Sequence, residues 1–171
     1  MIFKQLENDL ILLKPLEAKD FEALFAIASD KEIWTQHPNF NRYQRDEFAV
    51  YFRSLLHSNQ PYLIIDKTKD MIVGATCYYE YCSTEKSIAI GYTFISKEYW
   101  GRNYNRQVKH LMILHAFEYI EKVIFHVRKG NIRSQKALEK IEARFVKEYP
   151  DPNSEGGIRL EYQIQKNLFR N

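Results

Sequence analysis

A turn of glycine, asparagine and arginine residues precedes a long apolar helix pattern and has the composition of a phosphate site. It reads Trp100-Gly101-Arg102-Asn103-Tyr104-Asn105, and Arg106 follows. Amides at the start of a helix lack acceptors within that helix, so they form a natural site for phosphate groups. Glycine lets a ligand approach the backbone, asparagine tolerates left-handed dihedrals, and the two arginines carry positive charge. The alternative is an ordinary connection between a strand and a helix with a solvated basic rim.

A second polar pair, Asn131 and Ser134, falls where a predicted strand ends and a short helix begins. An amide and a hydroxyl at such a junction can face a bound ligand. The structural alternative for Asn131 is an N-cap, in which its side chain accepts a hydrogen bond from the first turn of the helix. Ser134 lies in that first turn, where a solvated hydroxyl is equally ordinary. Both residues are therefore candidate site residues with a plain structural alternative.

The hydrophobic patterns predict an α/β domain that positions these junctions. Short polar turns separate residues 62–65, 71–81 and 87–95, which predicts an antiparallel meander after a strand over residues 10–16. Apolar residues recur at helical spacing from Phe21 and again from Phe48. The helix after Asn105 is apolar around much of its circumference, so we expect it to pack against the sheet. A strand over residues 123–127 and a hairpin over residues 144–149 and 158–164 complete the sheet.

Taken in order, these motifs resemble the GNAT superfamily of N-acetyltransferases, in the branch that includes ribosomal-protein N-terminal acetyltransferases and their small-molecule relatives. The likeness covers residues 10–149 and consists of Ile90-Gly91-Tyr92-Thr93-Phe94, the turn from Trp100 to Asn105, and Asn131-Ile132-Arg133-Ser134 followed by Ala137-Leu138-Glu139-Lys140. Each motif alone is weak, and the set is specific. The resemblance implies one domain over residues 1–171, with a mixed, mostly antiparallel twisted sheet, helices on both faces, and a splay between the fourth and fifth strands.

The resemblance also implies transfer of an acetyl group from acetyl-CoA to a primary amine, by direct attack of the neutral amine on the thioester. One strand would pair with the pantetheine arm, and the turn would bind the pyrophosphate. Asn131 would hold the pantetheine or acetyl region, and Ser134 would protonate the leaving thiolate, directly or through water. The implied cofactor-binding residues are Tyr92, Thr93, Phe94, Ile95, Trp100, Gly101, Arg102, Asn103, Tyr104, Asn105, Arg106, Asn131 and Ser134.

Three positions depart from the family pattern. Asn103 stands for the second glycine of the turn, Ala89 for an acidic residue before Ile-Gly-Tyr, and Glu142 for a glycine after the last helix. The change at Ala89 leaves the general base unassigned, while the change at Glu142 concerns a turn. The catalytic candidates are Ser134, Asn131, Glu80 and His126, and Glu161 and Tyr162 are further possible proton acceptors. The alternative function is a non-catalytic acyl-CoA-binding or regulatory module with the same fold.

Aromatic residues provide the candidate acceptor site. The resemblance builds this site from the first two helices, their loop and the closing hairpin loop. The substrate-binding candidates are Trp34, His37, Tyr79 and Tyr81. Core packing is the alternative for most of these rings. An aromatic wall suits a protein N-terminus or a hydrophobic small-molecule amine.

Composition narrows the class of partner. The chain has 171 residues, 45% of them hydrophobic, and a net charge of +3 without clustered basic residues, which argues against nucleic acid. The lack of a signal peptide or a long apolar run predicts a cytoplasmic protein with no membrane contact. Separately, we expect a monomer or a homodimer. Cys77 and Cys82 lack metal-ligand spacing, so we expect two reduced thiols and no metal.

Overall fold

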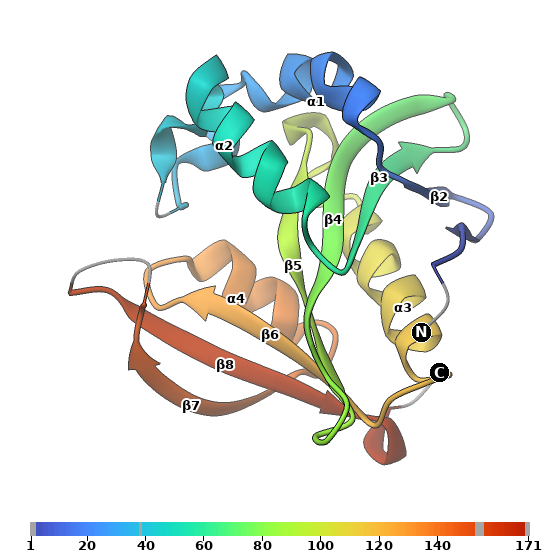
Figure 1. The fold of residues 1–171 in the computed structure, drawn as a ribbon, viewed down its shortest axis with the longest axis vertical. Helices are drawn as coiled ribbons and strands as arrows, with labels where there is room; N and C mark the ends of the chain where they lie inside the picture. Colours follow the sequence, from blue (N-terminus) through green and yellow to red (C-terminus); the bar gives the residue numbers. More distant parts are fainter. Residues whose placement is uncertain (1–2, 38, 153–155, 170–171) are drawn as a thin grey trace.

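A single open sheet organises the protein (Figure 1). The computed structural model describes residues 3–37, 39–152 and 156–169, and in these ranges eight strands follow the order β1-β2-β3-β4-β5-β6-β8-β7. Neighbouring strands are antiparallel except β5 and β6, which are parallel. The strands are β1 Leu6–Glu7, β2 Ile11–Pro15, β3 Gln60–Asp66, β4 Met71–Cys82, β5 Ser87–Ile95, β6 Lys122–Arg128, β7 Arg144–Pro150 and β8 Ile158–Gln165. The predicted mixed, mostly antiparallel sheet is confirmed.

Helices cover both faces of the sheet, as predicted. The helices are α1 Phe21–Ala28, α2 Arg45–Leu56, α3 Tyr104–Ala116 and α4 Ile132–Glu139. Helices α1 and α2 share one hydrophobic core with β3 and β4, in which Phe21 contacts Phe48 and Phe52 at ring-centroid distances of 5.5 and 5.1 Å. Helices α3 and α4 share the second core with the opposite face of the sheet (Figure 1). The elements β1, η2 (Lys31–Trp34) and η3 (Phe40–Tyr43) were not predicted, because two to four residues carry no readable period.

The sheet opens between β5 and β6. The two strands pair only over Ser87–Ala89 of β5 and Lys122–Ile124 of β6, and they diverge beyond these residues (Figure 1). These strands are the fourth and fifth of the predicted set, so the expected splay is confirmed. The remaining half of β5 has β4 on one side and an opening on the other.

Two glycines allow the close contacts that shape β5 at this opening. A Cβ on Gly74 of β4 would lie 2.0 Å from the carbonyl oxygen of Phe94, so only glycine fits there. A Cβ on Gly91 would lie 2.7 Å from the ring of Tyr79, which crosses β5 at that point. The register between β4 and β5 shifts here, and Tyr92 has a φ of 50°. Glycine inside a strand is typical of a bulge or a close backbone approach, and both are found at these positions.

Two further findings concern the cysteines and the helices. Both Cys77 and Cys82 are free thiols. In the described ranges, no helix combines the length and apolar character that crossing a bilayer requires.

Candidate active site

The turn before α3 has the geometry of a phosphate cradle. Gly101 and Asn103 adopt left-handed backbone conformations with φ of 75° and 67°, and the space beside Gly101 is open. Within the described ranges, the amides of the turn and of the first turn of α3 donate to no backbone or side-chain acceptor at five positions: Gly101, Asn103, Tyr104, Asn105 and Arg106. Because these amides lie at the positive end of a 13-residue helix, the turn can bind an anion through its main chain.

Neighbouring side chains fix this turn in place. The indole of Trp100 donates to the carbonyl oxygen of Ile95 at 3.0 Å, and the guanidinium of Arg133 lies 4.1 Å from the Trp100 ring. The rings of Tyr99 and Tyr104 are 4.7 Å apart, and the Tyr99 hydroxyl donates to buried Asp66 at 3.0 Å. The turn is thereby joined to β5, α4 and β3 before any ligand arrives.

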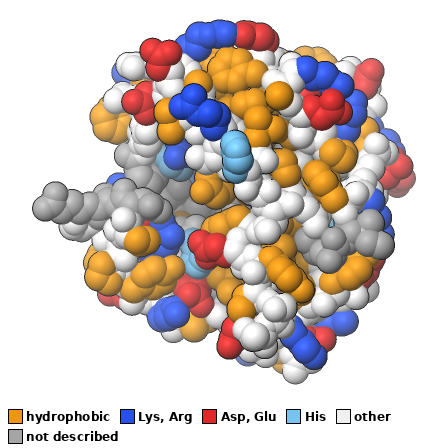
Figure 2. All heavy atoms as spheres, viewed as in Figure 1, with side chains coloured by type: hydrophobic (Ala, Val, Ile, Leu, Met, Phe, Trp, Pro, Cys, Tyr) orange, Lys and Arg blue, Asp and Glu red, His pale blue; other side chains and the backbone are white. Residues whose placement is uncertain are grey.

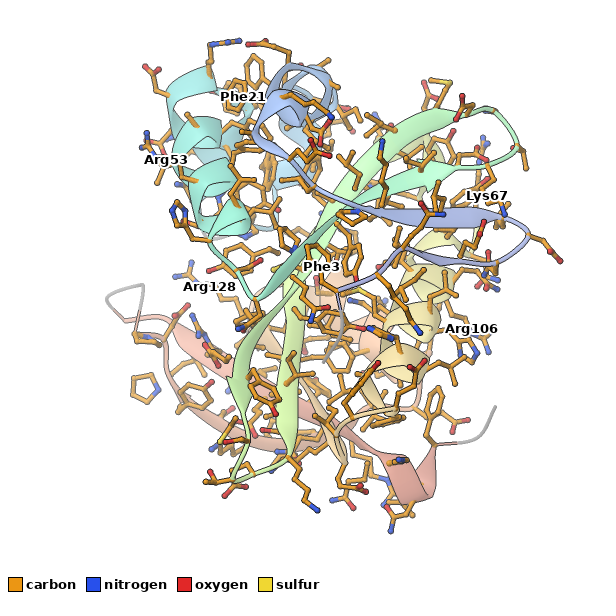
Figure 3. All side chains as sticks on the ribbon, turned by 45° about the vertical axis from the view of Figure 1, so that its right-hand side comes forward. Phe3, Phe21, Arg53, Lys67, Arg106 and Arg128 are labelled. Atoms are coloured by element: carbon orange, nitrogen blue, oxygen red, sulfur yellow. The ribbon has the colours of Figure 1, made fainter. Side chains whose placement is uncertain are left out.

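Two arginines and one amide add polar groups to the turn. Arg102 and Arg106 are exposed, and Figure 3 shows Arg106 on the outer side of α3. The side-chain oxygen of Asn105 is buried and lacks a hydrogen-bond partner within the described residues. A buried acceptor without a partner is costly, so a donor group of a ligand is a natural complement to it.

The predicted pantetheine strand runs along the opening in the sheet. Beyond Ala89, β5 has no partner on its β6 side. Phe94 and Ile95 point into the two hydrophobic cores, and the hydroxyl oxygens of Thr93 and Thr76 are 2.8 Å apart. Tyr92 is 39% exposed. The site-facing group in this strand is therefore the backbone edge together with the Tyr92 ring.

Asn131 caps α4. Its side-chain oxygen accepts a hydrogen bond from the Ser134 amide at 3.1 Å, which is the N-cap arrangement given above as the structural alternative. Ser134 is half-buried in the first turn. The cap explains the asparagine without excluding a ligand contact, and the roles of both residues toward a cofactor stay predictions.

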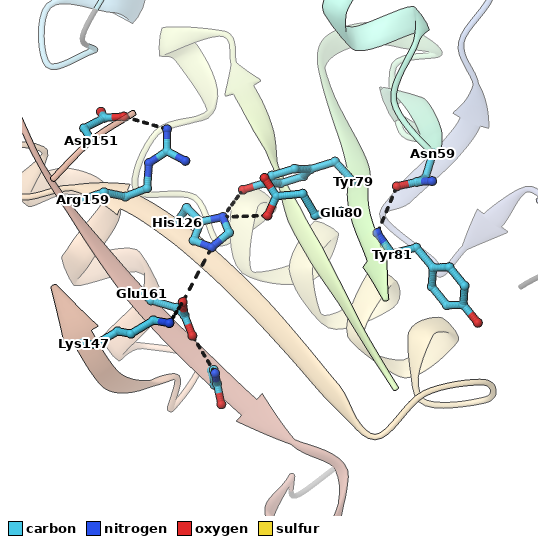
Figure 4. Close-up of polar contacts among 10 residues, drawn as sticks. Asn59, Tyr79, Glu80, Tyr81, His126, Lys147, Asp151, Arg159 and Glu161 are labelled. Carbon is cyan, nitrogen blue, oxygen red and sulfur yellow. Dashed lines mark hydrogen bonds and ion pairs between the residues drawn. The ribbon is translucent and has the colours of Figure 1, made fainter. Parts of the chain in front are cut away.

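A cluster of titratable groups lies at the splay (Figure 4). The hydroxyl oxygen of Tyr79 is 2.8 Å from Nδ1 of His126 on β6, a contact that spans β5 because Gly91 has no side chain. Carboxylate oxygens of Glu80 and Glu161 lie 3.8 Å from Nδ1 and 4.0 Å from Nε2 of the same imidazole. Glu161 is almost fully buried, and Lys147 and Gln163 contact it at 3.3 and 2.7 Å.

Burial sets the protonation states in this cluster. It lowers the pKa of the His126 imidazole, and the negative charges of Glu80 and Glu161 only partly oppose this effect. Burial also raises the pKa of the Tyr79 hydroxyl well above its usual value. At neutral pH the cluster therefore holds a neutral imidazole next to a protonated phenol, with two carboxylates nearby. This is the arrangement of a proton acceptor whose charged form is stabilised by fixed negative charge.

The structure brings only some of the predicted acceptor residues to the opening between β5 and β6. Figure 2 shows one face of the molecule hollowed between its upper and lower halves, with basic, acidic and histidine side chains gathered at the hollow. Tyr79 belongs to the cluster at the splay. Trp34 is only 2% exposed, and its indole donates to the Ala28 carbonyl oxygen at 2.7 Å. It is therefore a core residue that packs behind the residues of the site. Tyr81 lies at the far end of β4, points away from His126 and is 48% exposed, so the structure does not bring it to the site (Figure 4).

His37 lies beside a residue that sequence reasoning missed. Nε2 of His37 is 2.9 Å from Nη1 of Arg42, and the Arg42 guanidinium lies 4.5 Å from the centre of the Tyr51 ring. Burial and the positive charge of Arg42 lower the pKa of His37 to about 3. The Tyr51 hydroxyl donates to the carbonyl oxygen of Tyr92, which ties this group to the bulge in β5. No motif surrounds Arg42 or Tyr51, and only the packing of η3 against α2 places them here.

Comparison with known proteins identifies the family. Residues 10–144 match the model of the acetyltransferase (GNAT) domain, which is most of the chain. The chain therefore belongs to the GNAT family and is an N-acetyltransferase.

Solved structures share the fold at low sequence identity. A GCN5-related N-acetyltransferase from Brucella melitensis is 18% identical with a TM-score of 0.85, covering 98% of this chain and 80% of that one. A candidate ribosomal-protein-serine acetyltransferase from Vibrio cholerae is 15% identical with a TM-score of 0.73, covering 95% and 97%. Spermidine N-acetyltransferase from Vibrio cholerae, in complex with CoA and spermine, is 17% identical with a TM-score of 0.71, covering 96% and 100%.

Proposed function

We propose that this protein transfers an acetyl group from acetyl-CoA to a primary amine on a protein N-terminus or a small molecule. One observation carries the proposal. The strand that leads to the phosphate-binding turn is the same strand that opens from β6, and His126 and Tyr79 meet at that opening. A thioester held along β5 would thus lie beside a proton acceptor.

The residues present fit the cofactor. The five free amides at the start of α3 would bind its pyrophosphate, with Arg102 and Arg106 supplying positive charge. The open backbone edge of Tyr92, Thr93, Phe94 and Ile95 would pair with the amides of the pantetheine arm. Trp100 holds the turn, and Asn131 and Ser134 lie at the start of α4 beyond the splayed strand. When bound, the cofactor supplies the activated acetyl group.

The cluster at the splay would take the proton of the attacking amine. An ammonium has no lone pair, so the amine must lose a proton to react. The hydroxyl of Tyr79 would accept this proton while passing its own to Nδ1 of His126, over the observed 2.8 Å. Glu80 and Glu161 would stabilise the resulting imidazolium. The Ser134 hydroxyl would pass a proton to the leaving sulfur while taking one from water, so that it ends the step as a hydroxyl.

The test is release of free thiol from acetyl-CoA in the presence of a panel of peptides and small amines. We expect turnover with at least one amine and acetylated product in the mass spectrum. His126→Gln should reduce kcat by about a hundredfold, the lower end of what a positioned base contributes. His57→Gln is the matched control, because His57 is exposed at the end of α2 and should leave turnover unchanged.

Two results would contradict the proposal. Binding of acetyl-CoA without thiol release for any amine would favour the non-catalytic acyl-CoA-binding or regulatory module. Full activity in His126→Gln would remove the imidazole from the reaction. A cytoplasmic location, action on no nucleic acid, and a monomeric or homodimeric state stay predictions alongside this function.

A further inference from the structure

Arg42 in η3 is a cation with no carboxylate partner in the described part of the chain. Its Nη1 contacts His37 at 2.9 Å, and its guanidinium lies 4.5 Å from the centre of the Tyr51 ring and 5.6 Å from that of Trp34. Within the residues that the structure describes, no Asp or Glu oxygen lies within ion-pair distance of it. The side chain is half-buried, and burial lowers the pKa of its guanidinium. A partly desolvated charge of this kind is stabilised by an anion.

Charges of both signs act near Arg42: the carboxylate of Glu47 on α2 partly opposes the effect of burial on the pKa of its guanidinium, and two further arginines add positive charge. The positive charges of Arg128 and Arg133 act on His37 in addition to that of Arg42, and all three lower the pKa of its imidazole. Figure 3 shows Arg128 between the α2 side of the molecule and strands β7 and β8. Arg133 is held by the Ile33 carbonyl oxygen and by Trp100, and Arg128 faces Asp151 at 3.7 Å. Arg42 is the member of this group that no carboxylate or carbonyl oxygen engages among the described residues.

The opposite side of the hollow holds two carboxylates beside His126, and its cations are paired, Lys147 with Glu161 at 3.3 Å and Arg159 with Asp151 at 2.8 Å. Glu80 and Glu161 flank His126, where the amine of the acceptor would lose its proton. Tyr92 lies between the two sides, because Arg42 and Glu80 both act on its hydroxyl, whose pKa is raised mainly by burial. Rings link the two ends: Tyr51 is 6.0 Å from Tyr92, and Tyr92 is 5.4 Å from Tyr79. Within the residues that the structure describes, the cations at the amine end are therefore paired with carboxylates, whereas the guanidinium of Arg42 at the other end is not.

We propose that the acceptor of this enzyme bears a carboxylate in addition to its amine, and that Arg42 binds that carboxylate across the Tyr92 ring from His126. The planar guanidinium matches a carboxylate through two parallel hydrogen bonds, and stacking on Tyr51 holds it in orientation. Arg42 is a specificity-determining residue that acts on binding of the acceptor. The inference rests on the proposed acetylation of an amine, and it names the class of amine.

Matched acceptors test the inference. Each ω-amino acid is compared with the alkylamine of the same chain length, and peptides with aspartate as the second residue are compared with their asparagine counterparts. The first pair detects a carboxylate of a free amino acid, and the second detects a side-chain carboxylate of a peptide. We expect kcat/KM to favour the carboxylate in at least one series by about tenfold to a hundredfold, as one charged pair provides.

Substitution of Arg42 tests whether this residue causes the preference for carboxylate-bearing acceptors. Arg42→Met keeps the length that packs on Tyr51 and should reduce the preference to about twofold or less, mainly through KM. The control is Arg45→Gln, because Arg45 is 54% exposed and pairs with Glu22 on the outer surface. It should keep the full preference. Binding of acetyl-CoA to Arg42→Met, measured by calorimetry, should match the wild type, which shows that the fold and the cofactor site are intact.

The outcomes separate this inference from the proposed function. Turnover that favours neutral or polycationic amines over carboxylate-bearing ones overturns the inference and leaves the function standing. A carboxylate preference that survives in Arg42→Met also overturns it. Absence of turnover with every amine refutes the proposed function, and the inference is then refuted with it.

Discussion

His37 should make the stability of this protein fall in acid. Burial and the positive charge of Arg42 lower the pKa of His37 from 6.5 to about 3 in the folded protein. In the unfolded chain the imidazole is exposed to water and keeps its ordinary value. Between these two values the unfolded chain binds a proton that the folded protein does not, so the free energy of unfolding decreases as the pH falls.

The size of the effect follows from the difference in pKa. Each pH unit inside the window changes the free energy of unfolding by about 1.4 kcal/mol for one proton. Acidification from about pH 7 to about pH 4.5 should therefore remove about 2.5 kcal/mol through His37 alone. His126, whose pKa is lowered by burial, adds a loss of the same sign, and carboxylates such as Glu118 with lowered pKa add to it at lower pH.

Comparison of two proteins isolates the contribution of His37. His37→Gln has no titratable group at this position, so its unfolding free energy should depend less on pH by about 2.5 kcal/mol over the same range. Urea unfolding followed by the fluorescence of Trp34, which contacts His37 at a ring distance of 5.7 Å, measures both proteins. Equal pH dependence in the two proteins would refute the assignment of a neutral, buried imidazole to this position.

Three further predictions concern the turns and the start of α4. Gly101→Glu should abolish the rise in Tm on addition of acetyl-CoA. The φ of 75° disfavours any side chain at this position and the new negative charge repels phosphate, so binding should weaken by about tenfold or more. An unchanged shift in Tm would contradict the phosphate site. Ser134→Ala should lower kcat by about tenfold with little change in acetyl-CoA affinity, and an unaffected rate would remove its hydroxyl from the reaction. Glu142→Gly should raise the free energy of unfolding by about 1 kcal/mol in urea, because Glu142 has a φ of 60° just after α4; a loss of stability would contradict this.

Much of the fold was predictable because its signals are periodic and local. The strands β3 to β5 are runs of mostly buried residues separated by short polar turns, and α3 carries an apolar surface over 13 residues, long enough for its helical period to be read. Glu142, which replaces a family glycine, was expected to concern a turn, and its left-handed backbone agrees. The position of β8 between β6 and β7 was not predicted, because strand order depends on contacts between residues far apart in sequence.

The candidate site was predictable where it depends on backbone. The turn before α3 is indicated by its own residues, and the opening between β5 and β6 was implied by the resemblance to the GNAT family. The side-chain cluster was predicted only in part, because His126, Glu80 and Glu161 come from three strands and are assembled by Gly91, which lets Tyr79 cross β5. Arg42 could not be identified from the sequence, because its importance depends on which charged groups lie near its guanidinium in the folded protein.

Hydrogen–deuterium exchange with and without CoA tests the central claim most directly, because it reports on the amides that are said to bind. The account predicts slower exchange on addition of CoA at the turn and first helical turn, residues 101–106, and along the outer half of β5, residues 92–95. The strands β2 and β3, far from the opening, should be unaffected. Protection confined to other segments, or none at a CoA concentration that saturates binding, would contradict it.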